Sequence, residues 1–260
     1  MNKTIVLKCG GSIIHQLSDS FFHSLQNLKQ SNWKIVIVHG GGPDITKMLS
    51  SLKISSQFYH GQRKTTKEVL EIAEMVLAGK INKQLTNTLQ QHTIKAIGIS
   101  GSDGELLQGE FLNKEQLGLV GKVTDVNTKL ISLLTDNGYI PVIAPLALTA
   151  TGETLNVNAD LAAAAIANNL EAEKLLFVTD VPGILDENGY VIKKISQTEI
   201  NEHILNGVIT GGMIPKVESA ISTLSEKLQE VMIVSGKASL LEGEDFIGTK
   251  IVRVKEAIIS

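Results

Sequence analysis

Three short segments combine glycines with charged or polar residues, and each follows an apolar run or begins an amphipathic segment. They are Lys8–Ser12, His39–Asp44 and Thr210–Lys216. Glycine after a strand lets the backbone approach a ligand closely and leaves N–H groups free to bind anionic oxygens. A single glycine pair often serves only as a tight turn. Three such clusters favour a binding site for an anion such as a phosphate.

Two lysines stand beside these glycines in positions that local structure does not explain. Lys8 ends an apolar strand, where its ammonium group reaches either solvent or a bound anion. Lys216 follows Pro215, which suits the first position of a helix, and a lysine in a first turn is unfavourable by about 0.3–1 kcal/mol because of the helix dipole. Its long stem could instead carry the charge into water. A residue that breaks a local rule without local gain is a candidate functional residue.

Other polar residues near the ends of predicted elements allow both a structural and a functional interpretation. Asn158 suits a helix N-cap and Asp160 suits a first turn, so helix capping alone explains both. Arg63 could bind a carboxylate through two hydrogen bonds, although surface arginines are common. Asp180 follows a predicted strand, where it either caps the turn or contacts a nucleotide.

Several motifs of common enzyme classes are absent from the sequence. No G-x-x-x-x-G-K-[ST] segment occurs, the glycines at 40–42 do not continue into G-x-G-x-x-G, and residues 98–102 lack the last glycine of G-x-S-x-G. The histidines show no metal-binding spacing such as H-E-x-x-H. These absences argue against a P-loop NTPase, a Rossmann dehydrogenase, an α/β-hydrolase and a zinc hydrolase.

The composition is that of a globular protein. The 260 residues are 43% hydrophobic and 20% charged with a net charge of -3, which excludes disordered classes and argues against nucleic acid as a partner. No apolar run approaches the roughly 18 residues of a membrane span, and Lys8 interrupts the N-terminal run before a signal peptide could form. A single cysteine fits a reducing compartment. We therefore expect a cytoplasmic protein that binds neither membranes nor nucleic acids.

Short apolar runs alternate with longer amphipathic segments, which is typical of parallel strands joined by helices. The runs are rich in Ile, Val and Leu without strict alternation, as in strands covered on both faces. The predicted strands are Thr4–Cys9, Lys34–Val38, Ala96–Ser100, Ile140–Ala144, Leu175–Thr179 and Val231–Val234. The predicted helices are Ser20–Gln30, Asp44–Leu52, Thr66–Leu77, Asn82–Gln91, Asn127–Asn137, Ala159–Asn169, Glu199–Leu205 and Pro215–Glu226. The pattern predicts an α/β fold with an open, mainly parallel central sheet sandwiched by helices.

Two regions break this alternation and contain turn residues and polar alternation. Glu105–Thr124 and Leu146–Val157 are predicted to be hairpins inserted at the edge of the sheet. No linker rich in Pro, Gly or Ser divides the chain, but a new strand begins near Glu171–Lys174 after a long helix. We expect two lobes, residues 1–173 and 174–260.

Six segments taken together resemble the amino acid kinase family. They are LKCGGS at 7–12, IVIVHGGGP at 35–43, GQR at 61–63, NVNAD at 156–160, VTDVPGIL at 178–185 and ITGGMIPKV at 209–217. Their order and spacing cover nearly the whole chain. The resemblance implies the amino acid kinase-like fold, with an amino-acid-binding and dimerising N-terminal lobe and an ATP-binding C-terminal lobe.

The resemblance also implies a role for each matching residue. The catalytic residues would be Lys8, Lys216 and Asp160, the acid holding both lysines in place. The substrate site would consist of Gly41, Gly42, Arg63, Asn156 and Asn158. The nucleotide site would consist of Gly10, Gly11, Asp180, Val181, Pro182, Gly183, Ile184, Leu185, Val208, Ile209 and Thr210. No residue of the chain is expected to bind a metal directly.

The activity implied is ATP-dependent phosphorylation of the γ-carboxylate of N-acetyl-L-glutamate, the second step of arginine biosynthesis. ATP and Mg²⁺ would be the cofactors, with Mg²⁺ held mainly by the nucleotide phosphates. A γ-carboxylate with a pKa near 4.3 is already ionised at pH 7, so the site needs no base. It needs cations and backbone N–H groups that reduce the repulsion between two anions.

Other functions remain open alongside this one. A kinase of the same family could act on an aminoadipate derivative or on carbamate, although Arg63 and Asn156 favour an acylated α-amino acid. A non-catalytic metabolite sensor or a structural subunit could also keep the fold, but the three expected catalytic residues and the glycine clusters argue against these. We further expect a homodimer. The amphipathic helix at 66–77 is a plausible dimer face, although its apolar stripe could equally belong to the core. Because the first predicted strand begins by Thr4, we expect no N-terminal helix of the kind that accompanies arginine inhibition in the family, and no such inhibition.

Overall fold

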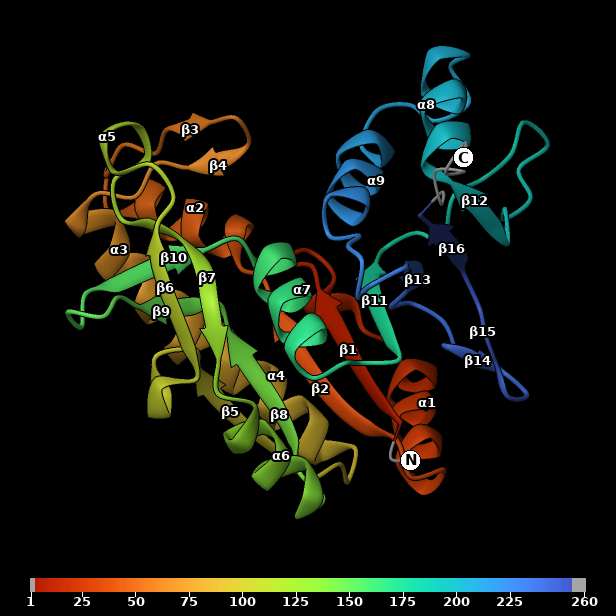
Figure 1. Cartoon of the computed structure of the whole chain (residues 1–260), viewed down its shortest axis with the longest axis horizontal. Helices are drawn as coiled ribbons and strands as arrows, with labels where there is room; N and C mark the ends of the chain where they lie inside the picture. Colours follow the sequence, from red (N-terminus) through yellow and green to blue (C-terminus); the bar gives the residue numbers. More distant parts are fainter. Residues whose placement is uncertain (1–2, 254–260) are drawn as a thin grey trace, which may run out of the picture.

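The computed structural model describes residues 3–253, and an eight-stranded sheet runs through its middle (Figure 1). The strand order is β12-β16-β13-β11-β1-β2-β8-β5, and every neighbouring pair is parallel except β13 and β16. In chain order the strands are β1 (Thr4–Cys9), β2 (Lys34–His39), β5 (Ala96–Ser100), β8 (Ile140–Ala144), β11 (Lys174–Thr179), β12 (Lys194–Ser196), β13 (Glu230–Ser235) and β16 (Thr249–Val252). The open, mainly parallel sheet is confirmed.

Helices cover both faces of this sheet, as the apolar strands require. Within residues 3–253 they are α1 (Asp19–Gln30), α2 (Gly42–Ser51), α3 (Lys67–Glu74), α4 (Asn82–Gln91), α5 (Lys114–Leu117), α6 (Thr128–Asp136), α7 (Ala159–Asn169), α8 (Gln197–Leu205) and α9 (Met213–Ser222). A π-helical segment, η2 (Met75–Ile81), joins α3 to α4, and short 3₁₀ turns occupy Ile14–Gln16 and Asp103–Glu105. The predicted helix 66–77 is therefore part α-helix and part π-helix.

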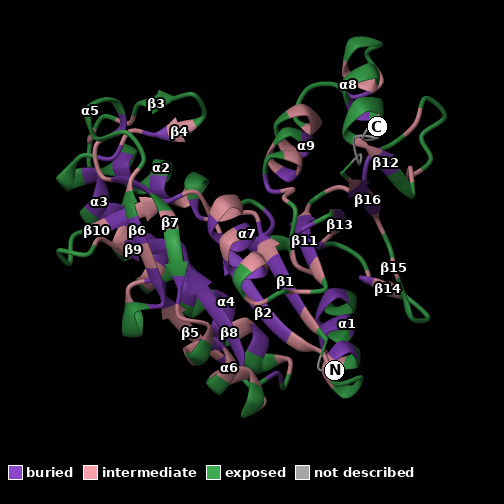
Figure 2. Ribbon diagram, viewed as in Figure 1, coloured by how far each residue is buried: buried purple, intermediate pink, exposed green. Residues whose placement is uncertain are grey.

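Alternate residues of the central strands enter two separate apolar cores, which appear as purple bands along the sheet in Figure 2. Leu7 and Ile37 enter one core together with Phe22 of α1. Val6 and Val36 enter the other, where α7 contributes mainly alanines. Small side chains let α7 lie close to the ends of β1 and β2, which brings the start of this helix to the site.

The two regions that break the alternation form hairpins, but these do not extend the central sheet. Strands β6 (Leu107–Phe111) and β7 (Val120–Val126) are antiparallel, as are β9 (Leu146–Leu148) and β10 (Thr154–Val157). The two hairpins join through parallel pairing of β7 with β10 and of β6 with β9, and so close into a small four-stranded barrel. The prediction that they are inserted at the edge of the central sheet is wrong. The hairpins form backbone hydrogen bonds with each other instead, and β5 remains the edge strand of the central sheet.

Several short elements have no counterpart in the sequence prediction. Strands β3 (Phe58–Tyr59) and β4 (Gln62–Arg63) form one hairpin, and β14 (Leu241–Glu242) and β15 (Asp245–Phe246) form another. Helix α9 also begins at Met213, so Pro215 occupies its third position rather than its first. Proline is tolerated there because the first four N–H groups of a helix have no partner within it. Within residues 3–253 no helix is long and apolar enough to cross a membrane.

Candidate active site

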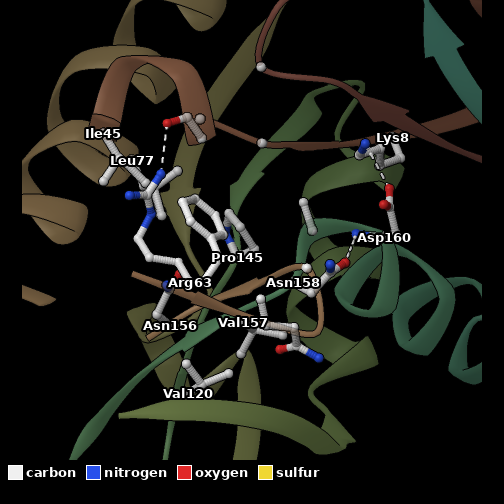
Figure 3. A pocket seen from close by; sticks show the side chains of 18 residues that line it. Lys8, Ile45, Arg63, Leu77, Val120, Pro145, Asn156, Val157, Asn158 and Asp160 are labelled. Carbon is white, nitrogen blue, oxygen red and sulfur yellow. Dashed lines mark hydrogen bonds and ion pairs between the residues drawn. The ribbon is translucent and has the colours of Figure 1, made fainter. Parts of the chain in front are cut away.

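A cavity of about 240 Å³ opens between the carboxyl ends of β1 and β2, the small barrel and the β3–β4 hairpin (Figure 3). Parallel strands place their carboxyl ends at one edge of the sheet, which is where open α/β folds bind ligands. Eight residues expected in the active site line this cavity: Lys8, Gly11, Gly41, Gly42, Arg63, Asn156, Asn158 and Asp160. Apolar walls come from Ile45, Leu77, Val120, Pro145 and Val157.

The first two glycine clusters lie against each other at one side of the cavity. The Gly40 N–H donates to the Cys9 carbonyl at 2.9 Å, which ties the two turns together. A Cβ atom on Gly11 would lie 3.1 Å from the Gly41 Cα, so a side chain there would push the turns apart. Gly42 begins α2, and a Cβ atom on it would meet nothing within 4 Å. The turns therefore leave backbone and a helix N-terminus facing the cavity, an arrangement that binds anions.

A buried polar pair that the sequence analysis missed supports these turns. The His39 ring is fully buried, and its Nδ1 donates to the Gly40 carbonyl at 3.1 Å. The Asn82 amide nitrogen lies 3.2 Å from His39 Nε2 and donates to the Val142 carbonyl at 2.8 Å. Burial lowers the pKa of His39 to about 4, so the ring is neutral and its Nε2 accepts. The only sequence signal was a histidine ending an apolar run.

Arg63 brings a buried positive charge to the end of the cavity away from Lys8 in Figure 3. Its guanidinium donates to the Gly42 carbonyl at 3.0 Å, to Thr46 Oγ1 at 2.7 Å and to the Ser56 hydroxyl, and stacks on the Phe58 ring. Burial lowers its pKa, but a guanidinium remains protonated at neutral pH. Its partners are neutral oxygen atoms, so its charge is available to an anionic ligand.

Asn156 and Asn158 stand at the ends of β10 and α7, on the wall that faces the glycine turns. The Asn156 amide nitrogen donates to Thr65 Oγ1 at 3.1 Å. Asn158 caps α7, because its Oδ1 accepts the N–H groups of Asp160 at 2.8 Å and Leu161 at 3.2 Å. Both residues line the cavity, so the capping of α7 by Asn158 is compatible with the substrate role expected of this residue.

The expected triad of two lysines and one acid has a different arrangement. Lys8 Nζ lies 2.7 Å from Asp160 Oδ1, as the resemblance implies. Lys216 Nζ instead lies 2.6 Å from Asp180 Oδ1. The hydrogen bond from Lys216 is the main cause that lowers the pKa of Asp180. Each lysine thus has its own carboxylate, because Asp180 at the end of β11 meets α9 where Lys216 projects.

The other expected nucleotide residues lie outside the lining of this cavity. Asp180–Leu185 follow β11, and Val208–Thr210 join α8 to α9. The side chains of Ile184 and Ile209 are buried in the core, so any nucleotide contact from them must come from backbone atoms. Gly183 has a φ of 154°, and a Cβ atom on it would lie 2.6 Å from Thr249 Oγ1. Gly10 lies beside Lys8, because a Cβ atom on it would be 3.9 Å from Lys8 Nζ.

The chain is similar to proteins of known family along its whole length. Residues 3–235 match the sequence pattern of the amino acid kinase family. An acetylglutamate kinase of Bacillus licheniformis is 56% identical over 258 residues, and one of Bacillus subtilis (strain 168) is 54% identical over 258 residues, with 99% of this chain and 100% of the relative covered in both cases. The solved structure of smu.665 from Streptococcus mutans UA159 has a TM-score of 0.83 at 34% identity and covers 97% of this chain and 99% of its own. The chain belongs to the amino acid kinase family.

Proposed function

We propose that the protein transfers the γ-phosphoryl group of ATP to the γ-carboxylate of N-acetyl-L-glutamate, in the second step of arginine biosynthesis. A carboxylate oxygen forms a bond to the γ-phosphorus, the bond from that phosphorus to the bridging oxygen breaks, and ADP leaves with the electron pair. The products are N-acetyl-L-glutamyl 5-phosphate and ADP. The names of relatives that are 54% and 56% identical over full length support this reaction.

The observation that carries the proposal is a single cavity with a cation toward each end. Arg63 lies at one end and Lys8 at the other (Figure 3), and the glycine turns line the same cavity. A dicarboxylic acid fits this charge pattern: Arg63 binds the α-carboxylate, and the γ-carboxylate then points toward Lys8. Asn156 and the apolar walls are left for the acylated amine.

The phosphoryl group would meet Lys8, Lys216 and the backbone of Gly10 and Gly11. These groups stabilise the charge that spreads over the phosphoryl oxygens in the transition state. Asp160 and Asp180 each hold one lysine, which limits the mobility of two long side chains of like charge.

We propose that Mg²⁺ is held mainly by the phosphates of the nucleotide. Both carboxylates at the site are paired with lysines, and residues 3–253 contain no cluster of three His, Cys, Asp or Glu side chains that could hold a metal. Mg²⁺ commonly keeps few protein ligands and binds through substrate phosphates. When bound it would neutralise phosphate charge.

We further propose that residues 1–173 bind the amino acid and form a homodimer, and that residues 174–260 bind ATP. The cavity is lined only by residues of the first range, whereas Lys216 and the expected nucleotide loops belong to the second. A cytoplasmic location is part of the proposal, and the single cysteine supports it.

A coupled ADP-release assay with N-acetyl-L-glutamate, glutamate and N-acetylaminoadipate side by side tests the function. We expect release with N-acetyl-L-glutamate well above the other two acceptors. Preference for N-acetylaminoadipate would support the related kinase instead. Binding of N-acetyl-L-glutamate or ATP by calorimetry without any ADP release would support the non-catalytic homologue.

A further inference from the structure

The carboxylate of Asp160 has a different partner on each oxygen. Its Oδ1 is buried and forms an ion pair with Lys8 Nζ at 2.7 Å, and among residues 3–253 it accepts no hydrogen bond. Its Oδ2 accepts a hydrogen bond from the hydroxyl of Ser219. Neither oxygen meets Lys216, whose ammonium group is held by Asp180.

Ser219 belongs to the same helix as Lys216. The two residues are three positions apart on α9 and therefore lie on neighbouring positions of one helix face. Ser219 is half-buried, and it comes 59 positions after Asp160 in the sequence. The contact therefore joins α9, which carries one lysine, to α7, whose first turn orients the other.

A carboxylate bonded at one oxygen only can rotate about its Cβ–Cγ bond and take its lysine partner with it. A donor on the second oxygen removes that freedom. Hydrogen bonds to charged groups contribute more than those between neutral groups, so one hydroxyl is enough to bias the orientation.

We propose that Ser219 is a positioning residue for phosphoryl transfer. Its hydroxyl fixes the Asp160 carboxylate, and the fixed carboxylate holds the Lys8 ammonium group at the place where the phosphoryl group passes. The inference rests on the proposed phosphoryl transfer but not on the identity of the acceptor.

Three variants test this role by steady-state kinetics. Ser219→Ala should lower kcat on the order of tenfold with both KM values little changed, because the lost bond acts on the reacting end of the site. Ser219→Thr keeps a hydroxyl donor and should restore most of the rate. Ser222→Ala is the matched control, since Ser222 lies one turn further along α9 and its hydroxyl donates only to the Ser219 carbonyl.

A second measurement, the rate at which Lys8 is acylated, reports how firmly Lys8 is held and does not require turnover. Acylation of Lys8 by an amine-reactive ester, followed by mass spectrometry on the nucleotide-free protein, should be faster in Ser219→Ala than in wild type. The exposed Lys47 serves as the internal reference.

The outcomes separate this inference from the proposed function. Unchanged kcat and unchanged Lys8 labelling in Ser219→Ala would overturn the role of Ser219. Equal loss of rate in the Ala and Thr variants would overturn it too, because the defect would then come from helix packing. A wild-type protein inactive toward N-acetyl-L-glutamate would refute the proposed acceptor, while the Lys8 labelling would still decide the inference.

Discussion

Positive side chains gather at the site although the whole chain has a net charge of -3. Lys8 and Lys216 each pair with one carboxylate, and Arg63 has only neutral partners. A local excess of positive charge is what a site needs when two anionic substrates must meet. Individual side chains rather than the overall charge therefore determine what this surface binds.

The two lysines are expected to contribute to turnover and little to folding. Lys8→Ala and Lys216→Ala should each lower kcat at least about 100-fold, because each removes a cation beside the transferred group. Circular dichroism should stay that of the wild type. Lys47→Ala, on the exposed side of α2, is the control. Near-normal kcat in either variant would remove that lysine from the catalytic residues.

Arg63 is expected to act on binding of the amino acid. Arg63→Ala should raise the KM for N-acetyl-L-glutamate by roughly 10- to 100-fold, since a hydrogen-bonded charge contributes about 1.5–3 kcal/mol. The KM for ATP should change little. Arg253→Ala offers a matched control because Arg253 is exposed. An unchanged amino-acid KM in Arg63→Ala would place Arg63 outside the substrate site.

At the level of elements, the glycine turns at the strand ends are supported by β2, α4 and η2. His39 ends β2 and Asn82 begins α4, and their hydrogen bonds hold the Gly40 carbonyl from behind the cavity. Gly41 is packed against Leu77 and Ile81 of η2, because a Cβ atom on it would lie 2.7 Å and 2.6 Å from their side chains. The glycine turns therefore owe their shape to packing against η2 and to the buried pair of His39 and Asn82.

The buried His39 predicts a pH dependence of stability. Its pKa is lowered by burial from 6.5 to about 4, so the unfolded chain binds a proton that the folded chain does not between these values. The resulting stability is present above pH 6.5 and is lost as the pH falls toward 4, by an amount on the order of 3 kcal/mol.

Urea unfolding between pH 7 and pH 4.5 measures this loss, with His39→Gln as the control. The free energy of unfolding should fall less steeply with decreasing pH in the variant, because glutamine cannot titrate at this position. His92 acts in the opposite direction, because hydrogen bonds to the Thr88 carbonyl and Asp19 raise its pKa, but it is present in both proteins. An equal pH dependence of the free energy of unfolding in the two proteins would contradict the role given to His39.

In the whole molecule, one sheet connects the two expected lobes. Strand β1 pairs with β2 on one side and with β11 on the other (Figure 1). Lys8, near the end of β1, therefore stands between the strand that leads to the glycine turn at 40–42 and the strand that leads to the proposed nucleotide loops. The contact of Ser219 with Asp160 crosses the same junction. We therefore expect the orientation of the lobes and the spacing of Lys8 and Lys216 to be linked.

We expect a homodimer in solution. The apolar stripe of α3 is not free to form it, because Val69, Leu70, Ile72 and Ala73 are buried within the chain. Large apolar side chains remain exposed nearby, including Met75 at 62% and Phe58 at 59%. Light scattering should give twice the mass of the chain. A mass of one chain or of six chains would contradict the dimer.

The sequence predicted much of the site because its signals are local. Strand β1 and helices α4 and α7 have the predicted bounds, and the Asn158 cap is confirmed. Periodicity and capping depend on residues two to four positions apart, which a sequence displays directly. The first two glycine clusters also placed the cavity, since the carboxyl ends of parallel strands meet at one edge. The third cluster, at 210–216, lies outside its lining.

Contacts between distant residues were decided only by the tertiary structure. Three contacts join residues far apart in the chain: the pairing of Lys216 with Asp180, the bond from Ser219 to Asp160 and the contact of Asn82 with His39. The closure of two hairpins into a barrel likewise depends on contacts between distant segments. The amino-acid sequence by itself determined the α/β fold and indicated the residues that are expected to meet an anion. Packing decided which carboxylate holds which lysine, because that choice depends on how helices α7 and α9 lie over the sheet.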